Sequence, residues 1–141
     1  MKISIRKGVF ETNSSSTHSI SISSEGSPTD SIHVNADGEI RVYGEFGWEE
    51  DDHYESSEKL AYAVIYASRQ EDKMQMLKEA VAEHLNIPEV TFRGDGVKGD
   101  DFGYTDHQSF GEVAEAFSSK ETLINFIFNP NSFFTTGNDN N

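Results

Sequence analysis

The spacing of apolar residues changes once along the chain, and this change limits the folds open to it. Over the first third, apolar and polar residues alternate, in the pairs Ile3 and Ile5, Ile20 and Ile22, Ile32 and Val34, and Ile40 and Val42. This period of two is typical of β-strands with one buried face. From Ser56 onward apolar residues recur every three or four positions, which is typical of helices. Strands followed by helices predict an α+β fold.

The length of the chain predicts a single domain. Folding a chain of 141 residues buries roughly 68% of its surface, which is enough for one hydrophobic core. We expect residues 1–136 to form this domain. Residues 137–141, with the sequence Gly-Asn-Asp-Asn-Asn, are expected to form a flexible, solvated tail.

Turn-forming residues predict how the N-terminal strands pair. The Asp37-Gly38 step supplies the positive φ of a tight turn, so residues 31–43 are predicted to form a β-hairpin. Residues 24–30 are rich in Ser, Gly and Pro and predict another connection. We therefore expect an antiparallel β-meander of four strands, with residues 11–17 as a loop between the first two.

Start and stop signals after residue 55 predict three to four helices and one or two short C-terminal strands. The helices are expected from Ser56, from Glu71 to Asn86, from a capping box at Ser109 and Glu112, and over residues 123–127. The strands are expected at residues 90–92 and 132–136. Residues 93–104 hold four glycines and are expected to form a loop.

The composition excludes several classes of protein. The chain has 25 Asp and Glu against 11 Lys and Arg, a formal charge of -14, and no cysteine. Thiol catalysis and Cys-ligated metals are therefore excluded, and the negative charge argues against direct nucleic-acid binding. The longest apolar run, residues 60–67, is too short to span a bilayer. Residues 1–10 lack the apolar stretch of a secretory signal, so we expect a cytoplasmic protein without a membrane partner.

The negative charge is concentrated in residues 45–58, where seven acidic residues lie beside Phe46, Trp48 and Tyr54. One interpretation is a solvated loop whose carboxylates favour the N-terminus of the following helix. A second is a docking surface for a basic partner, such as a nucleic-acid-binding enzyme whose groove it would occupy as a phosphate mimic. A third is a divalent-cation site. The predicted partner-binding residues are Glu45, Trp48, Glu49, Glu50, Asp51, Asp52 and Tyr54.

Three glycines, at positions 94, 96 and 99, match the dinucleotide-binding spacing Gly-x-Gly-x-x-Gly. That fingerprint requires a helix N-terminus next, where the pyrophosphate binds. Here Asp100-Asp101 follow, which do not begin a helix and would repel phosphate. We therefore interpret the segment as a loop or hairpin and expect no cofactor.

None of the five histidines has the spacing of a metal-ligand pair, so no metal site is predicted. His84 is expected to pack beside the apolar face of the second helix, while His33 and His53 are expected to be exposed. His107 differs because Asp106, Gln108 and Ser109 surround it immediately before the predicted capping box.

The polar residues 11–19 form a flexible loop on the simplest interpretation. However, Val9–Ser19 resembles the motif Val-Phe-Glu-Thr-Asn-Ser-Ser-Ser-x-His-Ser of a group of mostly uncharacterised bacteriophage and prophage proteins. Gly103–Ser109 and Gly137–Asn140 resemble two shorter motifs of this group, and the three blocks together cover about 22 residues. The resemblance implies a phage setting and suggests that the three blocks meet in space.

Our leading hypothesis is a small acidic binding protein of phage origin that alters host physiology or defence. Its partner would be a host protein with a basic surface or a small anionic signalling ligand. The residues expected to bind such a ligand are Asn13, Ser14, Ser15, Ser16 and Gln108.

Two alternatives remain open. The first is a small hydrolase or transferase acting on a nucleotide or phosphoester, with His18 and His107 as acid and base and Asp106 orienting one imidazole. The second is a virion or assembly component that forms a homo-oligomer through C-terminal aromatic residues. These are Phe126, Phe128, Phe133 and Phe134.

Overall fold

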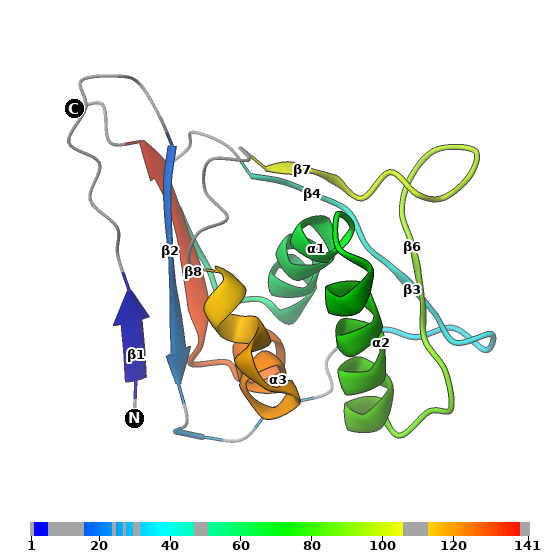
Figure 1. Cartoon of the computed structure of the whole chain (residues 1–141), viewed down its shortest axis with the longest axis horizontal. Coiled ribbons are helices and arrows are strands. Elements are labelled where there is room, and N and C mark those ends of the chain that lie inside the picture. Colours follow the sequence, from blue (N-terminus) through cyan, green and yellow to red (C-terminus); the bar gives the residue numbers. More distant parts are fainter. Residues whose placement is uncertain are drawn as a thin grey trace.

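The chain has an α+β fold, as its sequence predicts: strands come first, helices occupy the middle, and one strand closes the order. The structure is a computed structural model, and it describes residues 2–5, 16–23, 25–26, 28–29, 32–46, 51–105 and 113–138. The helices lie between a four-stranded sheet on one side and two short strand pairs on the other (Figure 1). Among the described residues, no helix is long and apolar enough to cross a bilayer.

The four-stranded sheet is antiparallel and includes strands from both ends of the sequence. Its strands, in spatial order, are β1 (Lys2–Ile5), β2 (Ser16–Ser23), β8 (Phe133–Asn138) and β5 (Asp51–His53). Ile20 pairs with Phe134, and both side chains are buried. The side chains of alternate residues on β2 and β8 thus cover the helices, and β8 occupies the interior of the sheet.

The prediction that the four N-terminal strands pair with one another as a meander is wrong. β2 pairs with β8, which lies more than a hundred residues later, and residues 32–35 form no strand. The predicted turn at residues 36–38 is present, with Gly38 at φ +79°. Asn35 Oδ1 accepts hydrogen bonds from the backbone N–H groups of Asp37 and Glu39, both at 2.9 Å. The Asn35 side chain thus stabilises the turn, although residues 32–35 do not form the first strand of the predicted hairpin.

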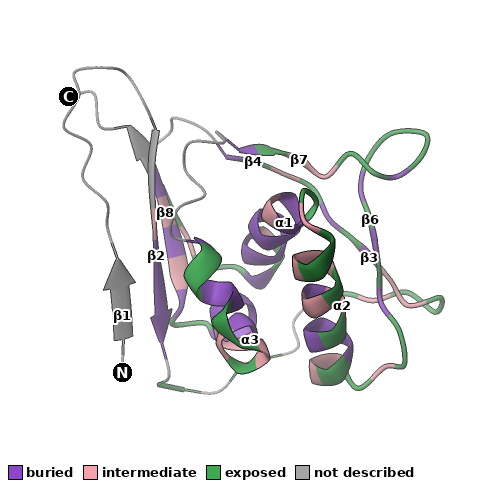
Figure 2. Ribbon diagram, in the orientation of Figure 1, coloured by how far each residue is buried: buried purple, intermediate pink, exposed green. Residues whose placement is uncertain are grey.

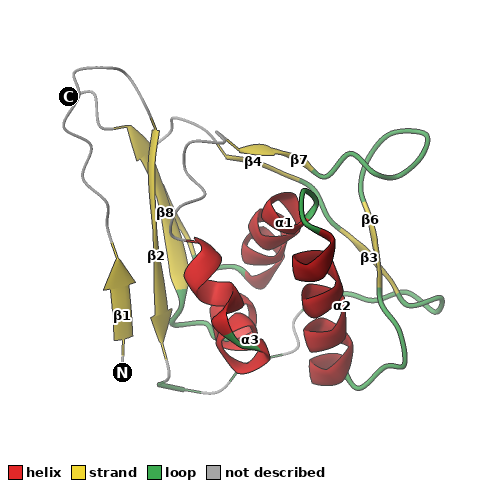
Figure 3. Ribbon diagram, in the orientation of Figure 1, coloured by secondary structure: helices red, strands yellow, loops and turns green. Residues whose placement is uncertain are grey.

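The remaining strands form one interrupted parallel strip. β3 (Glu39–Arg41) pairs with β6 (Thr91–Arg93), and β4 (Gly44–Phe46) pairs with β7 (Gly103–Thr105). Between the pairs, Val42 N–H donates to the carbonyl of Arg93 at 2.9 Å, so the strip continues. The loop of residues 94–102 leaves the strip between β6 and β7 (Figure 3). Gly103 ends it at φ +98°, where a Cβ would overlap the backbone of Gly44.

The helices begin and end close to their predicted bounds. They are α1 (Ser56–Ala67), α2 (Glu71–Leu85), a 3-10 helix η2 (Val113–Ser118) and α3 (Lys120–Phe128). Asn86 ends α2 in the left-handed conformation at φ 58°, as the predicted stop signal requires. The N-cap of α3 is Ser119, whose Oγ accepts from the Thr122 N–H at 3.0 Å. The predicted capping box at Ser109 and Glu112 lies outside the described residues.

The central helix of the core is α1. Leu60, Ala61, Tyr62, Ala63 and Val64 are all 1% exposed or less, so successive residues are buried on every side of the helix. A helix that is apolar all round is expected inside a core. It contacts α2, α3, β4 and β7. Figure 2 shows α1 buried through most of its length, whereas α2 has exposed residues on its outer face.

β8 continues into the segment predicted to be a tail. Gly137 pairs with Thr17, and Asn138 pairs with Ser16. Residues 139–141 lie outside the described residues.

A buried lysine joins helix α1 to the segment between α3 and β8. Lys59 is fully buried, and its Nζ donates to the carbonyl oxygens of Asn129 and Ser132, both at 2.7 Å. The Asn129 side chain is also fully buried, and its Nδ2 donates to the carbonyls of Ser23 and Glu25, both at 2.9 Å. The network therefore connects α1, the end of α3, the start of β8 and the end of β2.

We predict that Lys59→Met destabilises the fold by about 2–4 kcal/mol, because two buried carbonyls lose their donor. Urea unfolding followed by circular dichroism measures this. Lys78→Met is the matched control, since Lys78 is only half-buried and has no hydrogen-bond partner among the described residues. Equal stabilities of the two variants would contradict the prediction.

We also predict that the stabilisation by Lys59 depends on pH. Burial lowers the pKa of Lys59 to about 8 from its ordinary value of 10.5. Between these values the unfolded chain holds the proton and the folded chain does not, so the free energy of unfolding rises with pH. The difference in unfolding free energy between the wild type and Lys59→Met should therefore grow from about pH 8 to pH 10. A constant or falling difference would show that the folded state does not depress this pKa.

Candidate functional site

Two of the three motif blocks meet in the four-stranded sheet. Residues 16–21 of β2 pair with residues 133–138 of β8, so Ser16 lies opposite Asn138 and His18 lies opposite Thr136. The other predicted ligand-binding or catalytic residues lie outside the described residues: Asn13, Ser14, Ser15, Asp106, His107 and Gln108. A site formed by His18, His107 and Asp106 therefore stays a prediction.

A carboxylate, an imidazole and a hydroxyl lie in a row beside this register. His53 Nδ1 is 3.1 Å from Glu58 Oε2, and His53 Nε2 is 3.3 Å from Thr136 Oγ1. The ring stacks on Phe134 with 4.5 Å between ring centroids, and its side chain is 11% exposed. The prediction of an exposed His53 is wrong because β5 pairs with β8, which places His53 opposite the buried Phe134.

This row has the order of groups that hydrolases use to activate a hydroxyl. With Nδ1–H donating to Glu58, Nε2 of His53 accepts the Thr136 hydroxyl proton. Thr136 is only 2% exposed, so its hydroxyl presents almost no surface to a substrate. We interpret the row as a structural contact that joins β5, β8 and α1. Two further histidines lie as predicted: His33 is exposed, and His84 packs on Phe128 at 4.3 Å between ring centroids.

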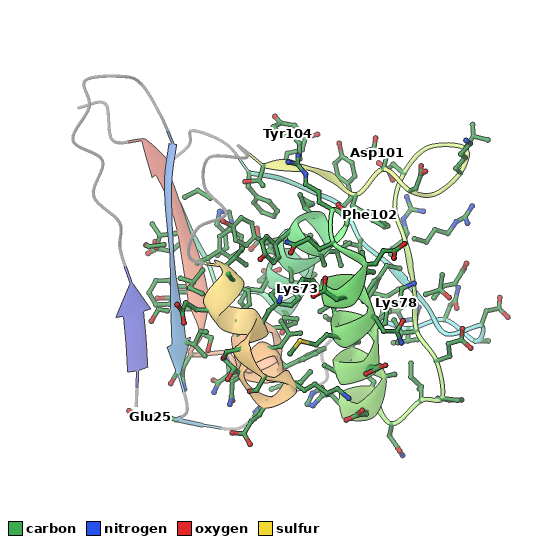
Figure 4. The ribbon with its side chains drawn as sticks, viewed as in Figure 1. Glu25, Lys73, Lys78, Asp101, Phe102 and Tyr104 are labelled. Carbon is green, nitrogen blue, oxygen red and sulfur yellow. The ribbon has the colours of Figure 1, made fainter. Side chains whose placement is uncertain are left out.

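An acidic and aromatic cluster covers the outer side of the β4–β7 pair. Tyr43 is 44% exposed, and its hydroxyl donates to Glu45 Oε2 at 2.7 Å. Glu45 lies opposite Tyr104, which is 58% exposed. The loop of residues 94–102 adds Asp95 and Asp101, whose charges also act on the Tyr43 hydroxyl. We call these five residues the acidic–aromatic face. In Figure 4, Asp101 and Tyr104 lie along the β7 side of the molecule, away from α2.

The negative charge of this face acts on the Tyr43 hydroxyl. The hydrogen bond to Glu45, together with the charges of Glu45, Asp101 and Asp95, raises the pKa of Tyr43 to about 12. Tyr43 therefore remains a neutral hydrogen-bond donor throughout the physiological pH range. The face offers a partner the carboxylates of Glu45 and Asp101 and two exposed phenol rings, whereas the Asp95 carboxylate pairs with Arg41 at 2.9 Å.

The predicted acidic segment is divided among different parts of the structure. Glu45 belongs to the acidic–aromatic face, and Trp48, Glu49 and Glu50 lie outside the described residues. Asp51 pairs with Thr136 through the backbone of β5. Asp52 accepts a hydrogen bond from Thr135 Oγ1 at 2.9 Å, and Tyr54 is 46% exposed and stacks on Phe133. Asp52 and Tyr54 therefore contact strand β8 of the four-stranded sheet and are not part of the acidic–aromatic face.

Sequence reasoning missed four members of this face, which are Tyr43, Asp95, Asp101 and Tyr104. The last three follow the acidic segment by more than 35 residues and reach the face only because β7 pairs in parallel with β4. The signal available in the sequence was the Asp-rich glycine loop followed directly by an aromatic residue.

The C-terminal aromatic residues do not form an exposed interface. Phe126, Phe128 and Phe134 are fully buried in the core of this chain, and Phe133 is half-buried against Tyr54. The predicted homo-oligomer surface made of these residues is therefore wrong, because β8 is an interior strand and α3 packs beneath the sheet.

Two hollows are lined by described residues. One, of about 310 Å³, lies between α2 and α3 and includes His84, Lys120 and Ile124. The ammonium group of Lys120 in this hollow is already ion-paired, since its Nζ is 2.8 Å from Glu83 and 3.2 Å from Glu79. The other, of about 350 Å³, lies on the β3–β6 pair. Within the described part of the chain, no cluster of three or more His, Asp or Glu side chains is arranged to hold a metal.

No family model matches the chain, and no curated protein or solved structure matches it either. A function must therefore be inferred from the residues of the chain itself.

We predict that Glu45→Gln lowers the pKa of Tyr43 from about 12 toward its ordinary value of 10, because the largest cause of the shift is removed. NMR of tyrosine ring carbons across a pH series measures this, with Tyr43→Phe assigning the signal. Glu89→Gln, on an exposed side chain outside the face, should leave the titration unchanged. An unshifted Tyr43 titration in Glu45→Gln would contradict the described hydrogen bond.

Proposed function

We propose that the chain is a binding protein that docks onto a basic surface of a partner protein through the acidic–aromatic face. The observation that carries this proposal is the clustering of Tyr43, Glu45 and Tyr104, at the β4–β7 pair, with Asp95 and Asp101 of the adjoining 94–102 loop. These residues come from two distant segments of the chain, so the fold itself creates the cluster.

The chemistry of the face suits a protein partner. Exposed tyrosines supply rigid contact area with a polar end, and such residues are enriched at interfaces. The carboxylates lie in a chain with a net charge of -14, so the field around it attracts a basic surface. Attraction of this kind mainly speeds association and weakens with added salt.

The resemblance of Val9–Ser19 to phage and prophage proteins supports a biological setting for this docking, which is an infected bacterium. We propose that the partner is a protein of the infected bacterial host, met in the cytoplasm, and that docking alters host physiology or defence. A nucleic-acid-binding enzyme is one suitable partner, because its groove is lined by Lys and Arg that otherwise contact phosphates.

The test compares two double variants that each remove two negative charges. Glu45→Gln with Asp101→Asn alters the face, whereas Glu89→Gln with Glu115→Gln alters exposed carboxylates elsewhere. Each variant is used as bait in a bacterial lysate, and association with the purified captured protein is then timed at low and physiological salt. We predict that the face variant alone loses the partner, with an association rate about tenfold or more below wild type.

If the two double variants captured the partner equally well, docking through the acidic–aromatic face would be contradicted. Capture of a partner without a basic surface, or association rates that do not change with salt, would exclude electrostatic docking.

The hydrolase alternative is favoured by one observation. The β2–β8 register places His18 opposite Thr136, whose hydroxyl contacts His53. Catalysis requires His18 and His107, so His18→Ala and His107→Ala should each abolish phosphoester hydrolysis by the purified protein. If the wild type hydrolyses no nucleotide or phosphoester, the alternative fails and the docking proposal stands unaffected.

A further inference from the structure

We propose that the hollow on the β3–β6 pair, here called the arginine recess, binds the phosphate group of a small hydroxylated molecule such as a nucleotide or sugar phosphate. The recess is lined by His33, Asn35, Glu39, Arg41 and Arg93 and has a volume of about 350 Å³. This volume is at the lower end of the range for small-molecule sites. The proposal does not rest on docking by the acidic–aromatic face, with which the recess shares the contact between Arg41 and Asp95.

The backbone register places two arginines side by side. Arg41 on β3 is the direct partner of Arg93 on β6, and neighbouring strands lie about 4.8 Å apart. The preceding pair, Ile40 and Phe92, is buried, so the two arginines lie on the opposite, exposed face of the strands. Like charges at directly paired strand positions repel and destabilise the pair. An anion between them would convert this repulsion into attraction.

Charge within the chain compensates only one of these arginines. Arg41 Nη2 is 2.9 Å from Asp95 Oδ1. Arg93 has no carboxylate or hydrogen-bond partner for its guanidinium among the described residues. Arg93 therefore retains the planar pair of N–H donors that matches a phosphate or carboxylate.

The glycine loop positions Arg93. Both the stem and the guanidinium of Arg93 lie against Gly99, where a Cβ would come within 3.1 Å of Arg93 Cγ and Nη1. Gly99 has φ +69°, and its carbonyl accepts a hydrogen bond from the Gly94 N–H at 2.7 Å. The loop thus packs against the side chain of Arg93 and leaves less rotamer freedom to be lost on binding.

The remaining lining residues favour a ligand that carries hydroxyl groups beside its phosphate. Glu39 Oε1 accepts from Asn35 Nδ2 at 3.1 Å, which holds a carboxylate in the recess. A carboxylate repels a bare anion but accepts hydrogen bonds from sugar hydroxyls. His33, which is exposed at the recess, adds a ring nitrogen that donates or accepts. The arginines would bind the phosphate, and Glu39 the hydroxyl groups.

The test titrates the purified full chain with inorganic phosphate, a nucleoside monophosphate and the uncharged nucleoside, at physiological salt, by NMR and calorimetry. We expect saturable binding of the monophosphate with shifts at Arg41 and Arg93, weaker binding of phosphate, and no binding of the nucleoside. Arg93→Gln should weaken binding about tenfold or more, because a charged two-pronged contact is lost. Arg93→Lys keeps the positive charge but lacks the two parallel N–H donors, so its affinity should lie between those of the wild type and Arg93→Gln.

Two further variants separate the recess from general charge effects. Asp95→Asn should strengthen binding severalfold, because it releases Arg41 and removes a nearby negative charge. Lys78→Gln removes the same unit of charge as Arg93→Gln from α2, outside the recess, and should leave the affinity unchanged. Thermal unfolding confirms that each variant is folded.

The proposal is overturned if neither phosphate nor the monophosphate saturates the wild type, or if Arg93→Gln binds as tightly as Lys78→Gln. Because Arg93 is not part of the acidic–aromatic face, its variants should still capture the protein partner. Loss of phosphate binding and loss of docking are therefore distinguishable.

Discussion

The fold depends on one buried ammonium group, which has no carboxylate partner among the described residues. Lys59 Nζ is held by two backbone carbonyls, of Asn129 and Ser132, and the amide of Asn129 in turn binds the backbone of Ser23 and Glu25. Burying a charge without a counter-ion is costly unless hydrogen bonds compensate it. The compensation here is geometric, because the carbonyls converge only when α1, α3, β2 and β8 are all in place. The network therefore favours this arrangement over other packings of the same helices and strands.

Pairing between strands that are distant in the sequence creates both proposed binding sites, the acidic–aromatic face and the arginine recess. The strip formed by β3, β4, β6 and β7 contacts α1 through β4 and β7, and it presents the acidic–aromatic face at one end and the arginine recess at the other. Asp95 belongs to the first and limits the second, because it pairs with Arg41. The 94–102 loop that carries Asp95 lies between the two sites. The negatively charged face and the positively charged recess are thus separated by only one short loop.

The helices could be predicted from the sequence, whereas the strand partners could not. α2 is defined by apolar residues three or four apart and by the stop at Asn86, all of which are local signals. The partner of β2 is decided by packing, since Ile20 needs an apolar neighbour and Phe134 supplies it from the far end of the sequence. His53 was misjudged for the same reason, and Asp101 and Tyr104 were missed because their place depends on β7. Glu45 alone among the acidic–aromatic residues was predicted, because its charge is evident without any knowledge of pairing.

The position of β8 inside the sheet affects how the protein is made. During synthesis β2 and β5 leave the ribosome long before residues 133–138, so both strands have an unpaired edge in the nascent chain. Edges of this kind pair readily with other chains, and such pairing leads to aggregation. The four-stranded sheet can form only after β8 is released, and the carbonyls that receive Lys59 are released with it. This sheet therefore cannot be completed before β8 is synthesised, and until then the many negative charges of the nascent chain oppose its association with neighbouring chains.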